Sequence, residues 1–295
     1  MRLDAIGQSN INAQKLKDFL FPFPPIEEQQ RIVERVNAIM EQIDEYEKIE
    51  QELMDLKADF PGDMKAAILQ AAMQGKLTEQ LDTDGSVDEL LSYIVEEKKE
   101  LFRKKSIDKP ILFSAIEDDE IPFKIPSKWK WVRWGLLSNS IQYGYNAPAQ
   151  VQGEVKMVRI SDIDKDVIKW DNVPCCFISK ENKTKYLLNE NDLLFARTGG
   201  TVGKSVLAKN VPENTAFAGY LIRSNYNKRL NSQYLKYFMD SELYWRQLRT
   251  GTTQTAQPNC NGKTLSKMII PLPPIEEQQR IVERLDALLP LCENL

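Results

Sequence analysis

Apolar residues between Pro25 and Phe60 recur at steps of three and four, and Glu, Lys and Asp fill most positions between them. This pattern continues over four heptads and is typical of a coiled-coil seam. An amphipathic helix on a globular core is the alternative, but the length and the narrow stripe favour the coiled coil. We expect a subunit interface at Ile32, Val36, Ile39, Ile43, Tyr46 and Leu53, with Ile49, Leu56 and Phe60 continuing the stripe.

A second feature of the chain is an internal repeat. The twelve residues Pro24–Arg35 return without change as Pro273–Arg284, at an offset of 249 residues. Prolines ahead of Glu-Glu-Gln-Gln predict a helix start, because proline is tolerated in the first turn and acidic side chains complement the helix dipole. A shared structural corner without functional meaning is the alternative. The second copy begins the same seam, so we expect its helix to pack on the Pro25–Phe60 helix of this or another chain, with interface residues Ile281, Leu285 and Leu288.

Between the two copies the pattern changes. Pro61-Gly62 should kink or interrupt the first helix, Gly75 should end its continuation, and Ser86 should cap a further helix to about Lys105. Short alternating segments then predict strands, and helical spacing returns near 232–248. The strands are expected at Val155–Ile160, Asp192–Ala196, Lys204–Ala208 and Tyr220–Arg223.

These patterns predict an α+β protein, in which a mixed α/β globular domain is attached to long coiled-coil helices. Residues 1–22 match 250–271 at several positions and read as the terminal stub of an upstream globular domain. The other expected domains are a helical scaffold at 23–107, the globular domain at 108–270, and the start of a second coiled-coil helix at 271–295.

The net charge of −4 divides unevenly along the chain. Residues 108–270 hold 23 Lys and Arg against 16 Asp and Glu, whereas 23–107 hold 11 against 20. Such asymmetry is expected when a basic domain that binds nucleic acid is attached to an acidic scaffold, and ordinary sampling of residues is the alternative. The chain has no histidine and its four cysteines lack Cys-x-x-Cys spacing, which argues against a zinc site and histidine-based catalysis. With no long apolar stretch or signal peptide, we expect a cytoplasmic protein without a membrane partner.

Thr198–Ser205 is similar to a phosphate-binding loop but is one residue short of the P-loop spacing, and Ser205–Ala208 reads as strand rather than helix. We instead expect a tight glycine-rich connection that brings Arg197 and Lys204 to a DNA backbone. The loop at 142–146 carries amides that can pair with adenine, although a solvated surface is the alternative. The DNA-binding candidates are Gln142, Tyr143, Gly144, Tyr145, Asn146, Arg159, Ser161, Lys183, Lys185, Arg197, Thr198, Gly199, Thr201, Lys204, Thr252 and Gln254.

The doubled Pro-Pro-Ile-Glu-Glu-Gln-Gln-Arg-Ile-Val, the segment Asn191–Lys204, and the stretches 125–131 and 220–223 together resemble the specificity subunit of Type I restriction-modification systems. The resemblance covers essentially the whole chain, but a full subunit carries two target recognition domains and this chain carries one and a stub. It implies a non-catalytic protein that reads one half of a split site in double-stranded DNA.

The resemblance also implies partners. In that family, modification subunits methylate adenine with S-adenosylmethionine, and restriction subunits translocate and cleave DNA, so S-adenosylmethionine, ATP and Mg are expected on those subunits and none on this chain. We expect two half-sized subunits to associate through their helices. A coiled-coil scaffold that binds protein rather than DNA is the competing interpretation.

Overall fold

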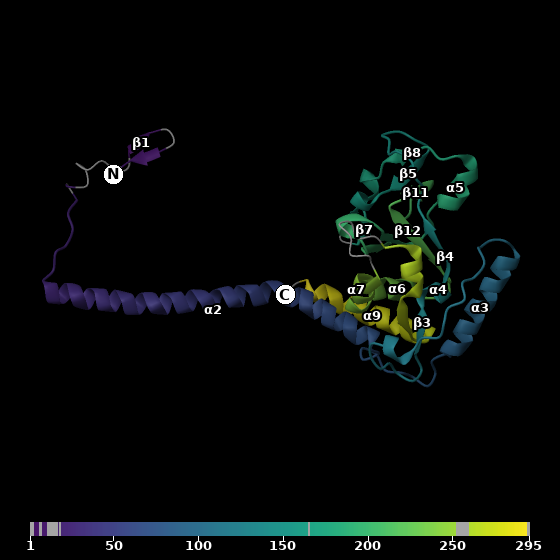
Figure 1. Ribbon diagram of the computed structural model, residues 1–295, viewed down its shortest axis with the longest axis horizontal. Helices are drawn as coiled ribbons and strands as arrows, with labels where there is room; N and C mark the ends of the chain where they lie inside the picture. Colours follow the sequence, from purple (N-terminus) through teal and green to yellow (C-terminus); the bar gives the residue numbers. More distant parts are fainter. Residues whose placement is uncertain are drawn as a thin grey trace. The chain divides into compact units, whose positions relative to one another are not determined.

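The computed structural model describes residues 3–5, 8–10, 17, 19–164, 166–251 and 260–293. The chain divides into two units, Met1–Asp59 and Phe60–Leu295. The domain boundaries expected from the sequence, near residues 22, 107 and 270, differ from this division at residues 59 and 60. They stay predictions. The fold itself is as predicted, with α-helices, several small β-sheets and one long helix (Figure 1).

The first unit contains a hairpin, β1 (Leu3–Ala5) with β2 (Gln8–Asn10), and most of helix α2 (Ile26–Met73). Glu27 and Glu28 lie in the first turn of α2, where carboxylates complement the helix dipole. The apolar stripe on this part of the helix is exposed, with Ile39 and Ile43 each 41% accessible. This part of α2 is not folded into a core, as the coiled-coil interpretation requires.

The sequence predicts a kink or an interruption at Pro61. The helix is not interrupted there, since α2 continues without a break to Met73. A proline removes one backbone hydrogen bond of the helix, and the remaining bonds and packing can hold it. That packing comes from Leu69, Ala72 and Met73, which are buried in the core of the second unit.

The end of α2 is as predicted. Gly75 has a φ of +69°, and a Cβ there would lie 2.4 Å from Pro126, so only glycine fits. Its N–H donates to Ala72 O, and Lys76 N–H donates to Ala71 O, which is the Schellman arrangement.

The next helix, α3 (Val87–Arg103), is capped by Ser86 as predicted, since the Ser86 side chain accepts from Glu89 N–H. Residues 106–128 then form an extended connection apart from the 3-10 turn η1 (Asp118–Glu120).

A four-stranded antiparallel sheet in the order β10-β9-β12-β4 forms the centre of the second unit. A three-stranded sheet, β11-β5-β8, adjoins it, and two strand pairs, β13 with β3 and β6 with β7, complete the strands described in this unit. The strands are β3 (Lys130–Arg133), β4 (Ser138–Tyr143), β5 (Val155–Val158), β6 (Ile163–Asp164), β7 (Val167–Ile168), β8 (Cys175–Cys176), β9 (Leu193–Ala196), β10 (Ser205–Leu207), β11 (Thr215–Phe217), β12 (Leu221–Tyr226) and β13 (Ile269–Leu272).

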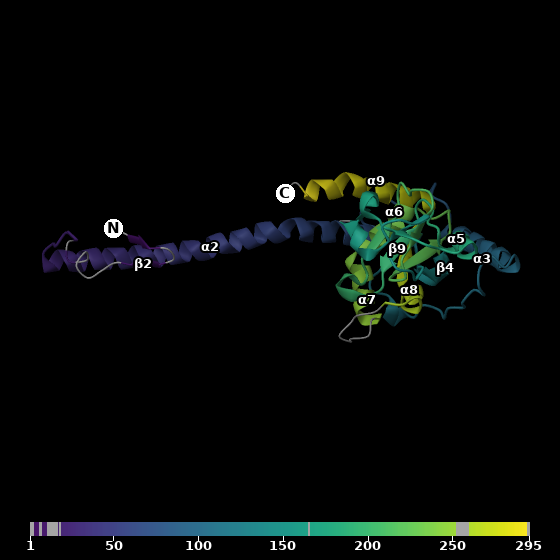
Figure 2. The same cartoon turned by 90° about the horizontal axis from the view of Figure 1, so that it is seen from above.

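Short helices cover these sheets, and α9 lies alongside α6 in both views (Figures 1 and 2). They are α4 (Trp134–Leu137), α5 (Lys180–Tyr186), α6 (Ser232–Asp240), α7 (Glu242–Gly251), α8 (Gly262–Lys267) and α9 (Ile275–Cys292), with 3-10 turns η2 (Ile160–Asp162), η3 (Trp170–Asn172) and η4 (Gly199–Thr201).

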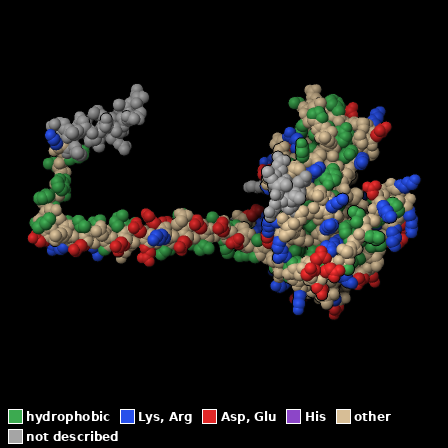
Figure 3. Space-filling view, in the orientation of Figure 1, with side chains coloured by type: hydrophobic (Ala, Val, Ile, Leu, Met, Phe, Trp, Pro, Cys, Tyr) green, Lys and Arg blue, Asp and Glu red, His purple; other side chains and the backbone are tan. Residues whose placement is uncertain are grey.

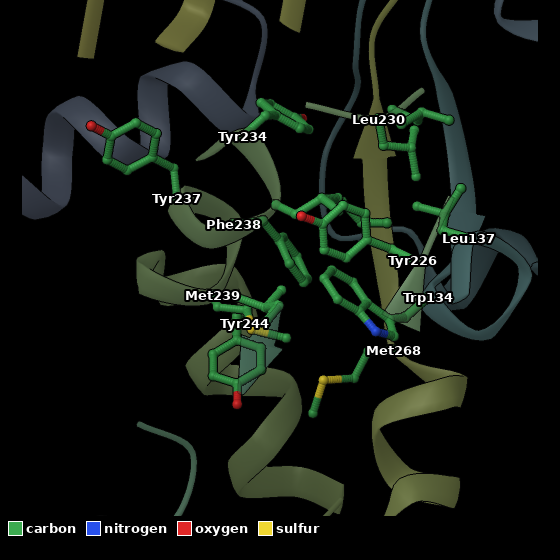
Figure 4. Close-up of a cluster of buried hydrophobic side chains, with 14 of the residues drawn as sticks. Trp134, Leu137, Tyr226, Leu230, Tyr234, Tyr237, Phe238, Met239, Tyr244 and Met268 are labelled. Atoms are coloured by element: carbon green, nitrogen blue, oxygen red, sulfur yellow. The ribbon is translucent and has the colours of Figure 1, made fainter. Parts of the chain in front are cut away.

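Aromatic side chains fill the main core (Figure 4). The Trp134 ring stacks on Phe238 at 5.7 Å between centroids, and the Trp134 indole N–H donates to Ser224 Oγ at 2.9 Å. Buried indole N–H and hydroxyl groups need hydrogen-bond partners, and here the Trp134 indole and the Ser224 hydroxyl bond to each other. This core positions the central sheet whose edge strand, β4, carries the candidate site.

The same core corrects one expectation. Ile281 and Leu285 of α9, expected to pack on the Pro25–Phe60 helix of this or another chain, are fully buried in the core of the unit 60–295, and Leu288 is half-buried. The seam pattern alone does not distinguish a helix partner from a globular one, and here both residues belong to the main core cluster of this unit.

Candidate nucleic-acid interface

The turn between β9 and β10 has the tight glycine-rich form that the sequence predicts. Gly203 N–H donates to Ala196 O, and Ala196 N–H donates to Lys204 O, so the two strands close directly around η4. Gly203 has a φ of +88°, and a Cβ there would lie 2.1 Å from Leu248 Cδ2. Because Ser205–Leu207 is a strand, the P-loop interpretation is excluded.

Arg197 and Tyr143 meet beside this turn. The Arg197 guanidinium lies 4.7 Å from the centroid of the Tyr143 ring, and the Tyr143 hydroxyl accepts from Gly262 N–H at 3.1 Å. Arg197 Nε is buried and has no hydrogen-bond partner among the residues that the structure describes. Tyr143 is 40% exposed and Arg197 is half-buried, so the pair places a positive charge on an aromatic ring close to the surface.

Such a platform suits a polyanion. An arginine held by a ring loses little side-chain freedom on binding, and its guanidinium geometry matches a phosphate group. Lys204 is exposed on the other side of the turn, and Gly199 and Gly200 are exposed within it, with open space where a Cβ would stand. Thr198 and Thr201, also in the turn, are half-buried. The turn therefore offers two cations and an accessible backbone.

Gln142 does not have the role that the sequence suggests. Its Nε2 donates to Lys185 O at 3.0 Å, and its Oε1 accepts from Arg223 Nη2 at 2.7 Å. Both ends of the amide are occupied, so Gln142 links β4 to the end of α5 and is not free to pair with a base. The correction could not be foreseen, because nothing in the local sequence indicates Arg223 as a partner.

Arg223 is the residue that sequence reasoning missed. It is 8% exposed, and its guanidinium donates to Asp192 Oδ2 at 2.9 Å and to Leu187 O at 2.7 Å besides Gln142. It thereby connects β12 and β4 to the residue before β9 and to the segment after α5. These partners offset much of the cost of burying the charge, although Arg223 Nε is buried without a hydrogen-bond partner among the described residues.

The expected loop at 142–146 is in part a strand, because Gln142 and Tyr143 are the last residues of β4. Of the residues that follow, Gly144 and Tyr145 are half-buried. Gly144 has no room for a side chain, since a Cβ would lie 2.2 Å from Ala218 O. The Tyr145 ring packs against Tyr186 at 5.1 Å between centroids. Asn146 is exposed and remains a candidate for base contact.

Arg159 is also committed elsewhere. Its Nε and Nη2 donate to the two carboxylate oxygens of buried Asp162 at 3.1 and 2.8 Å. Hydrogen bonding to Asp162 raises the pKa of Arg159, against the smaller effect of burial. The sequence names Arg159 as a DNA-binding candidate; its side chain is 40% exposed but is held in this bidentate pair, and a DNA contact there stays a prediction. Ser161, in the same 3-10 turn, is exposed.

Four candidates remain, two on helix α5 and two outside the described residues. Lys183 and Lys185 are on α5, half-buried and exposed respectively, and Lys185 Nζ is 5.6 Å from the centroid of the Tyr186 ring. Thr252 and Gln254 lie outside the described residues. The structure thus brings Tyr143, Arg197 and Lys204 to the same turn. Lys185 is linked to this region through its backbone carbonyl, which accepts from Gln142 of β4.

A pocket of about 330 Å³ adjoins Tyr143 between α3, β4 and α8. Lys263, on its wall, follows Gly262 directly and was not predicted. Lys98 is buried there and donates to Gly135 O and Leu136 O at 2.8 and 3.0 Å. Burial lowers the pKa of Lys98 to about 8.

Figure 3 shows Lys and Arg side chains spread over the visible face of the unit 60–295, whereas Asp, Glu and apolar side chains line much of the long helix. Among the described residues, none of the Cys, Asp and Glu side chains gather in a group that could hold a metal ion. The described helices include none with the length and apolar character needed to cross a membrane.

Comparison with known proteins gives consistent results. The chain is 25% identical to the specificity subunit of the Type I restriction enzyme EcoAI of Escherichia coli over 98% of its own length and 56% of the relative's. For the EcoKI specificity subunit of Escherichia coli strain K12 the identity is 24%, over 97% of the chain and 55% of the relative. The chain therefore spans about half the length of the curated relatives it matches.

A solved HsdS subunit from Thermoanaerobacter tengcongensis superposes with a TM-score of 0.49 and 19% identity, over 99% of this chain and 58% of that one. The profile of the family "Type I restriction modification DNA specificity domain" matches residues 3–54 and 151–294. With most of its length matched by that profile, the chain belongs to the Type I restriction-modification DNA specificity domain family.

Proposed function

We propose that this chain supplies DNA sequence specificity to a Type I restriction-modification complex and that its second unit binds one half of a bipartite site in duplex DNA. The observation that carries the proposal is the Arg197 guanidinium held on Tyr143 beside the open β9–β10 turn, with Lys204 across the turn. Phosphate contacts from these cations would fix the position of the unit on DNA. Base reading would then come from neighbouring exposed groups such as Asn146.

The second part of the proposal concerns assembly. The exposed stripe Ile32–Leu53 on α2 would pair with another helix, either from a second copy of this chain or from a different half-sized subunit. The helices would also recruit modification and restriction subunits. S-adenosylmethionine, ATP and Mg would be bound by those subunits, and the chain itself would be non-catalytic.

Binding to duplex DNA tests the first part. The chain, alone and with its modification subunit, is titrated into randomised duplexes at several salt concentrations. Affinity should fall steeply as salt rises, because each phosphate contact releases counterions. Affinity that is absent or independent of salt would contradict DNA binding and favour a scaffold that binds only protein, for which the exposed stripe on α2 is the supporting observation.

Sedimentation at micromolar concentration tests the second part. We expect self-association that is lost when Ile39 and Ile43 are replaced by glutamate, since charges in a seam oppose helix pairing. A clean 34.0 kDa monomer that still binds the modification subunit productively would contradict pairing.

A further inference from the structure

An exposed tyrosine lies beside the candidate interface without a partner of its own. Tyr220 is 64% exposed, and its side chain makes no hydrogen bond or ring contact with any residue that the structure describes. Every other tyrosine in the unit 60–295 has such a contact. Tyr220 also opens the segment 220–223, and the proposed function gives this ring no role.

The turn Ala218–Leu221, which carries Tyr220, is fixed to the surrounding strands. Leu221 N–H donates to Ala218 O at 2.8 Å within the turn, and Gly219 N–H donates to Tyr145 O at 2.9 Å. Ala218 and Leu221 are both buried, at 6% and 0% exposed. The backbone of Tyr220 therefore has little freedom left to lose on binding, and only the torsions of its side chain would be restrained.

This turn is adjacent to both residues to which the proposed function gives DNA contacts of different kinds. Arg197 N–H donates to Tyr220 O at 3.1 Å, so Tyr220 stands opposite Arg197 where the β9–β12 ladder ends. A Cβ on Gly219, the residue before Tyr220, would lie 3.7 Å from the Cβ of Asn146. Tyr220 is thus close to a cation suited to phosphate and to an exposed amide suited to a base edge.

The chemistry of the side chain favours bases over phosphates. A neutral aromatic ring gains no charge neutralisation from a phosphate, whereas the face of a base and the methyl group of thymine offer it apolar surface. Exposed tyrosines also anchor protein interfaces, but the neighbours of Tyr220 are an arginine on an aromatic ring and an amide, which are groups that bind DNA. DNA is therefore the partner that its surroundings favour.

We propose that Tyr220 is a specificity-determining residue, whose ring lies against a base of the half-site next to the phosphate held by Arg197. The inference rests on the proposed function and deepens it. Arg197 and Lys204 would supply affinity for any duplex, and Tyr220 would distinguish the target from other sequences.

Binding of variants to two duplexes tests the proposal. A target duplex is selected from a random pool with the unaltered chain and its modification subunit, and a scrambled duplex of the same composition is the reference. The affinities of the unaltered chain, Tyr220→Ala and Tyr220→Phe for both duplexes are measured by fluorescence anisotropy over a series of salt concentrations. The matched control is Phe102→Ala, which removes an aromatic ring that is 42% exposed on α3.

We expect Tyr220→Ala to weaken target binding by about tenfold or more, as the loss of one correct base pair does. Binding to the scrambled duplex should change by less than about twofold and the salt slope should stay the same, because no phosphate contact is removed. Tyr220→Phe should keep most of the preference, since the ring remains. Phe102→Ala should bind both duplexes as the unaltered chain does.

Modified target duplexes show which part of a base the ring contacts. Deoxyuridine in place of one thymine removes only the methyl group, and 2-aminopurine in place of one adenine becomes brighter when it is unstacked. At one position we expect either a loss of about fourfold with deoxyuridine or a rise in 2-aminopurine fluorescence, and Tyr220→Ala should abolish that effect. If neither probe distinguishes the unaltered chain from Tyr220→Ala at any position, the ring does not contact a base and the proposal is wrong.

Three further results would overturn the proposal. They are an unchanged ratio of target to scrambled affinity in Tyr220→Ala, an equal loss in Phe102→Ala, and a loss of binding to the modification subunit without DNA, which would assign Tyr220 to a protein interface. If the unaltered chain binds no duplex or selects no motif, the proposed function fails before any variant is compared, and this inference fails with it. Salt-dependent, selective binding that Tyr220→Ala leaves intact contradicts this inference alone.

Discussion

Replacing Arg197 and Lys204 together with alanine should weaken binding to all duplexes rather than change base preference. Each phosphate contact contributes a slope of about 0.9 to the fall of log affinity with log salt, so losing two should reduce the slope by about 1.8. If the two binding lines meet near 1 M salt, the variant should bind about 60-fold more weakly at about 0.1 M.

The measurement is fluorescence anisotropy on a random-sequence duplex and on a target duplex, across a series of salt concentrations. The matched control is Lys128→Ala with Lys130→Ala, which removes the same charge from residues already paired with Asp82 and Asp88. That control should leave the slope within about half a unit of the original, because paired surface cations contribute little.

Two results would refute the reasoning. One is an unchanged slope in the Arg197→Ala/Lys204→Ala variant, which would remove these cations from the interface. The other is an equal loss in the control variant, which would show that net charge, rather than the geometry around Tyr143, determines binding.

Three further predictions follow from single contacts. Gln142→Ala should lower the free energy of unfolding by about 1–3 kcal/mol in urea titration, yet leave base preference in duplex selection unchanged; altered preference would restore it as a reading residue. Gly203→Ala should destabilise by about 2 kcal/mol or more in thermal unfolding, because of the clash with Leu248 and the positive φ; unchanged stability would contradict this geometry. Hydrogen bonding to Arg280 lowers the pKa of Asp84, so that pair stabilises the fold fully above the ordinary Asp pKa of about 3.9, and its effect is lost as pH falls below that value. The stability gap between Arg280→Ala and the unaltered chain should stay constant from about pH 7 to about pH 4 and narrow only at lower pH, and a gap that stays constant below about pH 4 would contradict the assignment.

The sequence predicts most of the local structure. The three-and-four spacing predicts α2, Ser86 predicts the start of α3, and Gly75 predicts the end of α2, because each depends on neighbours in the chain. Pro61 is expected to kink or interrupt α2, and the helix is not interrupted because the residues that follow pack into a core built from distant parts of the chain.

The candidate site is harder to predict from the sequence than the local structure. The pairing of Tyr143 with Arg197 joins residues 54 positions apart, and Gln142 is held by Arg223, a partner that only the fold brings near. The partner of Arg159 is different, because Asp162 lies three residues along the chain and is within reach of a local reading. The same holds for the second copy of the repeat, because a buried helix face and a coiled-coil seam share one periodicity.

Mapping methylated adenines in a host that carries this chain with its modification subunit tests the central claim most directly. We predict methylation at a defined two-part motif that is lost when the chain is removed and weakened at every site by Arg197→Ala/Lys204→Ala. Methylation at the same motif without the chain would contradict the account.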